Sequence, residues 1–202
     1  MQTALVVPSP APAEKPAAKQ ALRRILRAAR RDYVAGLRLD EQAELQSRLV
    51  DHLLPLIRDR HCVAGYAPQG SEIDPTMLLW HAGNALIGSA YPAFLTASST
   101  MIFRSGPCAE DCPVGGVQPP GHAKTVEPDF VIVPLLAADR AGNRLGQGGG
   151  HYDRALPALR DKGARIVGVG WAMQLLDSGL PTEPWDVRLD AFVSPDGMLE
   201  FS

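Results

Sequence analysis

The sequence lacks the features of several specialised protein classes. Three cysteines among 202 residues are too few to staple a chain of this length, which excludes a disulfide-rich secreted domain and indicates a reducing compartment. No stretch approaches the roughly eighteen apolar residues of a membrane-spanning helix, and the start does not read as a secretory signal. A net charge of −2 offers no overall attraction to nucleic acid or anionic membranes. We therefore expect a cytoplasmic monomer or homodimer with a small-molecule partner and no nucleic acid or membrane partner.

The remaining composition is that of a globular protein. Hydrophobic residues make up 46% of the chain and charged residues 21%, enough for a substantial core in one domain. Residues 1–18 are rich in proline and alanine, which opposes a regular helix and predicts a flexible tail. We therefore expect a single domain over residues 19–202.

The region after this tail predicts an amphipathic helix with an unusual polar face. Apolar residues between Lys19 and Tyr33 recur at three- and four-residue steps. The other face is basic, with no acidic residue up to Arg31: Lys19, Arg23, Arg24, Arg27, Arg30 and Arg31. This face is either solvated or an anion site; RNA binding is less favoured because no aromatic residues are interleaved.

Later segments predict alternating helices and strands. A second helix is expected from Asp40, whose carboxylate is suited to capping it. Short apolar runs predict strands at 61–67, 85–90, 100–104, 130–135, 166–170 and 191–193. Helix-length stretches at 75–84 and 152–161 separate some of them. The pattern predicts an α/β domain of three layers, with helices on both faces of a mostly parallel sheet and ligands bound beyond the carboxyl ends of its strands.

The glycine-rich segment 146–150 is the most informative motif. Four glycines in five positions would let backbone amides approach a phosphate closely and would allow positive φ angles. Arg144 supplies a cation before the turn, and Asp153 supplies an oxygen ligand suited to Mg²⁺ after it. A helix beginning near Tyr152 would add its positive end, although Pro157 must lie in its first turn or kink it. These features predict a nucleotide polyphosphate site; a tight connection without a ligand is the alternative.

This segment resembles the signature of the 5-formyltetrahydrofolate cyclo-ligases, also called methenyltetrahydrofolate synthetases. The signature residues are Asp139, Gly142, Arg144, Leu145, Gly146, Gly148, Gly150, Tyr152 and Asp153. Three further family patterns occur in the expected order, at Lys19, Leu22 and Arg23, at Tyr66, Pro68, Glu72 and Ile73, and at Gln174, Pro181, Glu183 and Asp186. The resemblance covers nearly the whole chain after the tail.

The resemblance implies a fold like that of the ribose-phosphate isomerase and CoA-transferase group. It also implies ATP as co-substrate, Mg²⁺ as cofactor and 5-formyltetrahydrofolate, with or without a polyglutamate tail, as substrate. The implied ATP-binding residues are Lys19, Arg23, Arg144, Leu145, Gly146, Gln147, Gly148, Gly149, Gly150, His151 and Tyr152. Glu72, Gln147, His151 and Tyr152 would contact the folate, and Asp153 and Asp186 would hold Mg²⁺. Arg144, Tyr152 and Asp153 are the expected catalytic residues.

The family reaction explains the need for these groups. The formyl oxygen is a poor leaving group; in the family's proposed route it attacks the γ-phosphate of ATP and forms an imidate phosphate. N10 then closes the ring to give 5,10-methenyltetrahydrofolate, and ADP and phosphate are released. Such chemistry demands positioning and charge neutralisation rather than a protein nucleophile.

The chain departs from the family pattern at several positions. Asp74–Pro75 displaces the usual threonine, the segment before the loop reads Ala137–Ala138–Asp139, His151 replaces a tyrosine, Trp185 a histidine and Gln118 a glutamate. These differences leave a second hypothesis open, in which a divergent member binds nucleotide or folate without turnover. A sugar-phosphate isomerase or CoA-transferase activity would rest on fold analogy alone.

Other residues with reactive or stacking side chains carry weaker hypotheses. Cys108, Cys112 and His122 lack a fourth partner for zinc, and Cys62 fits a buried strand position. Ser178 and Ser194 have no motif of a nucleophile. The tryptophans Trp80, Trp171 and Trp185 fit either the core or a position stacked on a pterin, and Trp185 is the best candidate for stacking.

Overall fold

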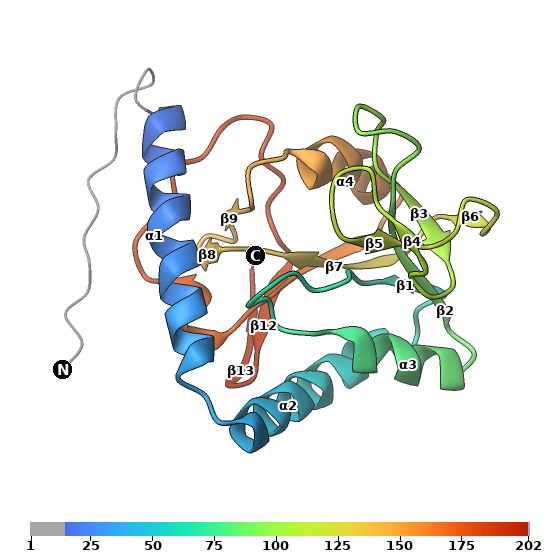
Figure 1. Cartoon of the computed structure of the whole chain (residues 1–202), viewed down its shortest axis with the longest axis horizontal. Coiled ribbons are helices and arrows are strands. Elements are labelled where there is room, and N and C mark those ends of the chain that lie inside the picture. The colour runs from blue at the N-terminus through green and yellow to red at the C-terminus, as the bar shows by residue number, and fades with distance from the viewer. Residues whose placement is uncertain (1–14, 202) are drawn as a thin grey trace.

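A mixed eight-stranded sheet forms the centre of the molecule (Figure 1). The computed structural model describes residues 15–201. In spatial order the strands of this sheet are β13 (Gly197–Glu200), β12 (Ala191–Ser194), β10 (Arg165–Val169), β7 (Phe130–Pro134), β1 (Cys62–Ala64), β2 (Gly88–Ala93), β3 (Ile102–Ser105) and β6 (Thr125–Val126). The five strands from β12 to β2 are parallel, and antiparallel strands flank them at both edges.

Helices cover both faces of this sheet. Helices α2 (Leu39–Ile57) and α3 (Thr76–Asn84) lie below it in Figure 1, and α4 (His151–Asp161) lies above it. Strand β7 shows why two cores form, because Phe130 and Ile132 join the cluster with α2 and α3, whereas Val131 and Val133 join the cluster with α4. Successive strand residues face opposite sides, so an uninterrupted apolar run suits a strand buried on both faces.

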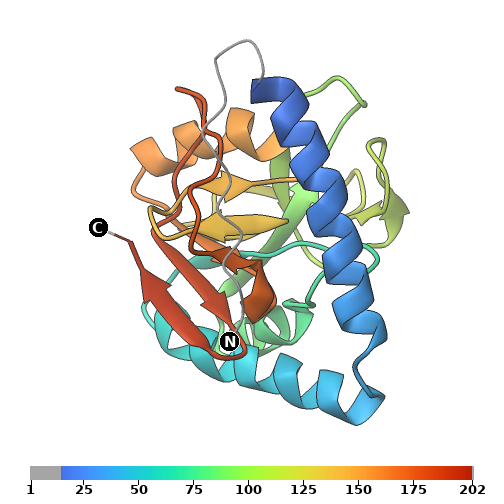
Figure 2. The same ribbon diagram turned by 90° about the vertical axis from the view of Figure 1, so that its left-hand side faces the viewer.

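The first helix packs elsewhere. Helix α1 (Lys15–Ala35) crosses in front of a small sheet made of β11 (Leu175–Leu176), β8 (Ala137–Asp139) and β9 (Arg144–Leu145) (Figure 2). Its buried Leu26 contacts a cluster that includes Leu136, Leu145 and Leu180. This packing brings the basic residues of α1 to the loop that follows β9.

The predicted fold class is confirmed, as are the six predicted strands and the helices at 75–84 and 152–161. The expected similarity to ribose-phosphate isomerases and CoA-transferases stays a prediction. Sequence patterns missed the short strands β4 (Glu110–Asp111), β5 (Val117–Gln118), β6, β8, β9, β11 and β13 and the 3₁₀ turn η1 (Ala172–Gln174). All of these elements are only two to four residues long, too short to show a period.

Two expectations about helices need correction. Helix α1 begins at Lys15, inside the predicted tail, because a proline such as Pro16 is tolerated in a first turn; residues 1–14 lie outside the described part of the chain. Asp40 does not cap α2, which begins one residue earlier with Arg38 at the cap position and no side-chain cap. Of the two alternatives for Pro157, the first turn is ruled out, because this proline lies in the interior of α4. The division into a tail and one domain is otherwise untested.

Within residues 15–201, no helix has both the length and the apolar character needed to cross a bilayer.

Candidate active site

A cavity of about 570 Å³ opens beside the end of β7, where Pro134 is part of its lining. Its wall comes from segments far apart in sequence, including α1, the loop after β1, the glycine-rich loop and the segment around Asp186. The structure brings together every site residue predicted from the sequence: Lys19, Arg23, Glu72, Arg144, Leu145, Gly146, Gln147, Gly148, Gly149, Gly150, His151, Tyr152, Asp153 and Asp186. Their individual roles stay predictions.

The glycine-rich loop needs its glycines for conformation and for space. Gly148 and Gly150 have φ angles of 106° and 64°, which side chains rarely adopt. A Cβ on Gly149 would come within 2.7 Å of the His151 ring, so a side chain at that position would require the ring to move. Gly150 is also the residue before α4, and no side chain caps this helix. The loop therefore presents backbone groups to the cavity next to the positive end of a helix.

Arg144 lies behind the loop in a largely buried position, with its side chain only 4% exposed. One terminal nitrogen, Nη2, donates to Asp153 Oδ1 at 2.5 Å, and Nη1 donates to the carbonyl of Pro134 at 3.4 Å. The buried Nε has no hydrogen-bond partner among the described residues. Arg144 also lies 5.6 Å from the centre of the Tyr152 ring. Arg144 lines the cavity, so an anion there would compete with these protein acceptors for its terminal nitrogens.

Tyr152 remains a neutral phenol in this environment. Burial raises the pKa of its hydroxyl well above the ordinary value, although the positive charge of Arg144 partly opposes the shift. Tyr152 can therefore donate a hydrogen bond at neutral pH, but it is not a base there.

A buried carboxylate shapes the turn that leads to Arg144. Asp139 is 2% exposed and accepts hydrogen bonds from the amides of Ala141, Asn143 and Leu180 and from the Asn143 side chain. These bonds close the turn between β8 and β9. Asp139 therefore supports the position of Arg144 and does not line the cavity.

Helix α1 reaches the cavity through its basic side chains. The ammonium of Lys19 contacts Asp186 Oδ2 at 2.8 Å and Glu183 Oε2 at 3.5 Å. Arg23 donates from Nε to the carbonyl of Gly146, and Arg27 donates to the side-chain oxygen of Gln147 at 2.9 Å. The basic face is therefore not fully solvated, and its interpretation as an anion site stays a prediction.

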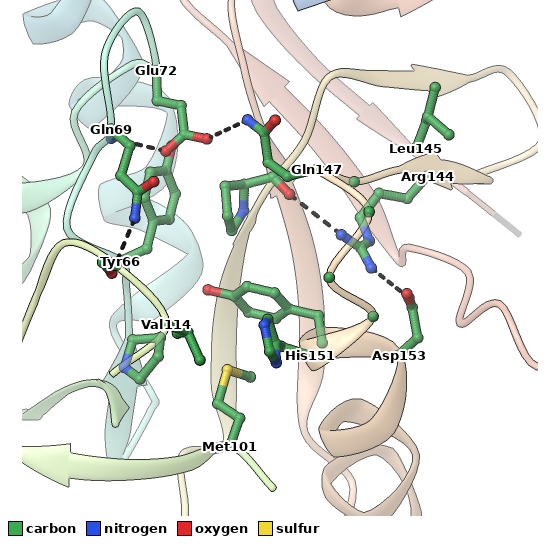
Figure 3. A pocket seen from close by; sticks show the side chains of 18 of the residues that line it. Tyr66, Gln69, Glu72, Met101, Val114, Arg144, Leu145, Gln147, His151 and Asp153 are labelled. Carbon is green, nitrogen blue, oxygen red and sulfur yellow. Dashed lines mark hydrogen bonds and ion pairs between the residues drawn. The ribbon is translucent and has the colours of Figure 1, made fainter. Parts of the chain in front are cut away.

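Glu72 connects this helix with the glycine-rich loop. Its Oε1 accepts a hydrogen bond from the side-chain amide of Gln147 at 2.9 Å and lies 3.6 Å from Arg30 Nη1. Its Oε2 accepts a hydrogen bond from the backbone amide of Gln69. Arg30 is almost fully buried, and this burial lowers its pKa against the opposing effect of Glu72. Figure 3 shows Glu72 and Gln147 pointing toward each other across the cavity.

The opposite wall is apolar. Tyr91, Phe94, Met101 and Val114 line it, and the His151 ring lies edge-on to Phe94 with ring centres 4.8 Å apart. In Figure 3 Met101, Val114 and His151 gather away from the Glu72 and Gln147 pair. The cavity therefore has one wall suited to charged groups and another suited to a flat apolar group.

His151 adds a neutral ring to this apolar wall. Partial burial lowers its pKa, and the nearby positive charge of Arg154 lowers it further. The imidazole is consequently uncharged at neutral pH.

Comparison with known proteins identifies the family of this chain. The sequence model of the 5-formyltetrahydrofolate cyclo-ligase family matches residues 15–195. The chain belongs to this family. The cyclo-ligase from Haemophilus influenzae is 32% identical over 182 residues, which cover 83% of this chain and 94% of that protein. The cyclo-ligase from Escherichia coli is 28% identical over 174 residues, 80% of this chain and 94% of the relative.

Solved structures agree with this assignment. The 5,10-methenyltetrahydrofolate synthetase from Aquifex aeolicus superposes with a TM-score of 0.75 at 26% identity, covering 90% of this chain and 92% of that one. The synthetase from Mycoplasma pneumoniae gives a TM-score of 0.69 at 23% identity, covering 88% and 98%, and supports the fold. The predicted family is confirmed, and so is the prediction that this cyclo-ligase family member is an enzyme of the ligase class.

Positions at which the chain departs from the family pattern have local structural roles. Gln118 is 5% exposed, and its amide group exchanges two hydrogen bonds with the backbone of Phe94. Asp74 accepts from the backbone amide of Thr76 at the start of α3. Gln118 thereby holds an apolar-wall residue in place.

Several pocket residues were not predicted as site residues from the sequence. They include Tyr66, Gln69, Tyr91, Phe94, Met101, Cys112, Val114 and Glu183. In the sequence, Tyr66 and Glu183 stand out only because they match the family pattern. The apolar residues among them belong to no motif. The three tryptophans lie in different environments. Trp171 is fully buried, Trp80 is an exposed residue of α3, and Trp185 is 65% exposed at the cavity.

Proposed function

We propose that this protein uses ATP and Mg²⁺ to cyclise 5-formyltetrahydrofolate to 5,10-methenyltetrahydrofolate, releasing ADP and phosphate. The observation that carries the proposal is the division of a single cavity into a cationic wall with a glycine-rich loop and an apolar wall with aromatic side chains. One wall suits a polyphosphate and the other suits a pterin ring, so both reactants can meet within one enclosure.

The phosphate groups are assigned to the cationic wall. Lys19, Arg23 and Arg144 supply three positive charges there, and the residues from Gly146 to Gly150 leave room for close backbone approach. A phosphate oxygen would replace Asp153 or Pro134 as an acceptor for the terminal nitrogens of Arg144. These groups would hold the terminal phosphate and neutralise charge as the phosphoryl group moves.

Asp153 and Asp186 fit a magnesium ion that is bound largely by phosphate. Both carboxylates line the cavity, but within residues 15–201 no three His, Cys, Asp or Glu side chains form a metal-binding group. Mg²⁺ at nucleotide sites commonly takes one or two carboxylates and fills its other positions with phosphate and water oxygens. When bound, it would neutralise phosphate charge and orient the nucleotide.

The folate is assigned to the apolar wall. Glu72 and Gln147 form the polar boundary between the walls and can hydrogen-bond the edge of a pterin, while Phe94 and His151 provide ring surfaces. The formyl oxygen would then attack the γ-phosphate, and N10 would attack the activated carbon as phosphate leaves. The protein's part is to align the two reactants and keep Tyr152 as a neutral donor beside them.

The direct test is an absorbance assay for 5,10-methenyltetrahydrofolate. Purified full-length protein is mixed with 5-formyltetrahydrofolate, Mg²⁺ and ATP, and a parallel reaction omits ATP. We expect the product to appear only with ATP and in equal amount to ADP. Folded protein that binds ATP but forms no product would contradict the proposal and favour the divergent binding protein.

A further inference from the structure

Two of the three cations expected to bind phosphate are each paired with a carboxylate expected to bind metal. Lys19 contacts Asp186 at 2.8 Å, and Arg144 contacts Asp153 at 2.5 Å. The first pair joins α1 to the segment after β11, and the second joins β9 to α4. They are two separate ion pairs that line one cavity.

In both pairs the cation is buried and the carboxylate is partly exposed. The Lys19 and Asp186 side chains are 8% and 18% exposed, and those of Arg144 and Asp153 are 4% and 28% exposed. By contrast, the Arg140 and Asp177 pair on the surface is 59% and 75% exposed. Surface pairs can separate at little cost because water and salt screen the charges, whereas a shielded charge that loses its partner needs a replacement.

We propose that these ion pairs exchange partners when nucleotide and Mg²⁺ bind together. Lys19 and Arg144 turn from the carboxylates to phosphate oxygens, and Asp186 and Asp153 turn from the cations to the metal. The inference rests on the proposed function and deepens it, because it predicts how the binding of one ligand depends on the other.

Neither ligand can complete this exchange alone. Phosphate without metal would take the two cations and leave two carboxylates beside its own negative charge. Metal without phosphate would take the carboxylates and leave Lys19 and Arg144 unpaired. Each ligand therefore supplies the partner that the other one removes, and the effect on affinity must be reciprocal.

Arg23 lies outside the exchange. It donates to the Gly146 carbonyl instead of a carboxylate, so its charge is already available to an anion. Glu183 is a secondary partner of Lys19 at 3.5 Å and is not an expected metal ligand. It provides a way to separate the exchange from a general change in pocket charge.

The test is calorimetric binding of ATP to the full-length protein, once in excess EDTA and once in excess Mg²⁺. The dissociation constant in EDTA divided by the dissociation constant in Mg²⁺ gives the metal dependence of ATP binding. We expect Asp186→Asn to bind metal-free ATP about tenfold more tightly than wild type and to lower the metal dependence by at least about tenfold. Asp153→Asn should change both quantities in the same direction by freeing Arg144.

Two matched variants serve as controls. Asp177→Asn makes the same chemical change in the surface pair with Arg140 and should leave both dissociation constants unchanged. Glu183→Gln removes a negative charge near Lys19, so it should tighten ATP binding similarly with and without Mg²⁺ and leave the ratio near the wild-type value. A ratio that falls as far in Glu183→Gln as in Asp186→Asn would overturn the exchange.

The remaining outcomes separate this inference from the proposed function. If both Asp variants melt at the wild-type temperature yet bind metal-free ATP no more tightly, the pairs are structural and the exchange is wrong. If one variant does not fold, the other decides the question. If wild type binds ATP equally with and without Mg²⁺, the exchange alone fails; if it binds no ATP in either condition, the proposed function fails with it.

Discussion

The two walls of the cavity are held in place by different forces. The cationic wall depends on ion pairs and hydrogen bonds between distant segments, such as Lys19 with Asp186 and Arg27 with Gln147. The apolar wall depends on packing, with Phe94 and Met101 embedded in the core cluster that also contains α4 residues. Charge placement should therefore govern nucleotide binding, and shape should govern folate binding, so that the two can be altered separately.

The largest expected effect comes from Arg144→Ala, which would break the cationic wall. The change removes a charge-assisted contact worth about 1.5 to 3 kcal/mol, so kcat/KM for ATP should fall by roughly ten- to a hundredfold. Steady-state kinetics at varied ATP would measure it. Arg140→Ala, an exposed arginine nearby in the chain, is the control and should retain wild-type kinetics. An unchanged kcat/KM in Arg144→Ala would remove Arg144 from the site.

Phe94→Leu would break the apolar wall and leave the cationic wall intact. Loss of an aromatic contact of about 0.5 to 1.5 kcal/mol predicts a KM for the folate that is two- to tenfold higher, with the KM for ATP unchanged. Phe103→Leu makes the same change at a buried core position outside the cavity lining and controls for lost stability. Equal increases in both KM values would contradict the separation of the walls.

Arg27→Ala should have a smaller effect, because Arg27 acts through Gln147. Its exposed side chain orients the Gln147 amide, which in turn donates to Glu72. Exposed contacts of this type contribute less than about 1 kcal/mol, so we expect the KM for the folate to rise about two- to threefold. Arg31→Ala, on the same helix and 70% exposed, should not change the KM.

The smallest expected effect concerns the pH dependence of stability at His151. Its pKa is lowered in the folded protein, so the unfolded chain binds the proton more readily. Stability from this group is present above the ordinary histidine pKa of about 6.5 and declines as pH falls through that value, until the folded form is protonated too. The melting temperature of wild type should therefore drop more between pH 7.5 and 5.5 than that of His151→Gln. An identical drop would show that His151 does not contribute.

The cationic wall was largely predictable from the sequence. Clustered glycines and the order Arg144 to Asp153 carry a physical meaning that does not depend on the rest of the fold, and the one-sided charge of α1 marked that helix as unusual. The central strands were predictable for a similar reason, because burial on both faces requires continuous apolar runs.

The apolar wall could not be predicted because its residues look like any other core residues. Tyr91, Phe94 and Met101 lie in or next to strands and belong to the core clusters, and only the three-dimensional path of the chain places them beside a cavity as well. The same limit applies to Arg30: the sequence showed its charge, but not that it would be buried against Glu72 and the Leu135 carbonyl. Residue type identifies chemistry more readily than it identifies neighbours.

The contact between Lys19 and Asp186 joins positions 167 residues apart. Helix α1 is synthesised early, whereas the segment that carries Asp186 follows six of the eight strands of the central sheet. Domains generally fold as units, so one wall of the cavity depends on a part of the chain that is made near the end of synthesis. A growing chain therefore cannot complete this pocket until the segment around Asp186 has been translated.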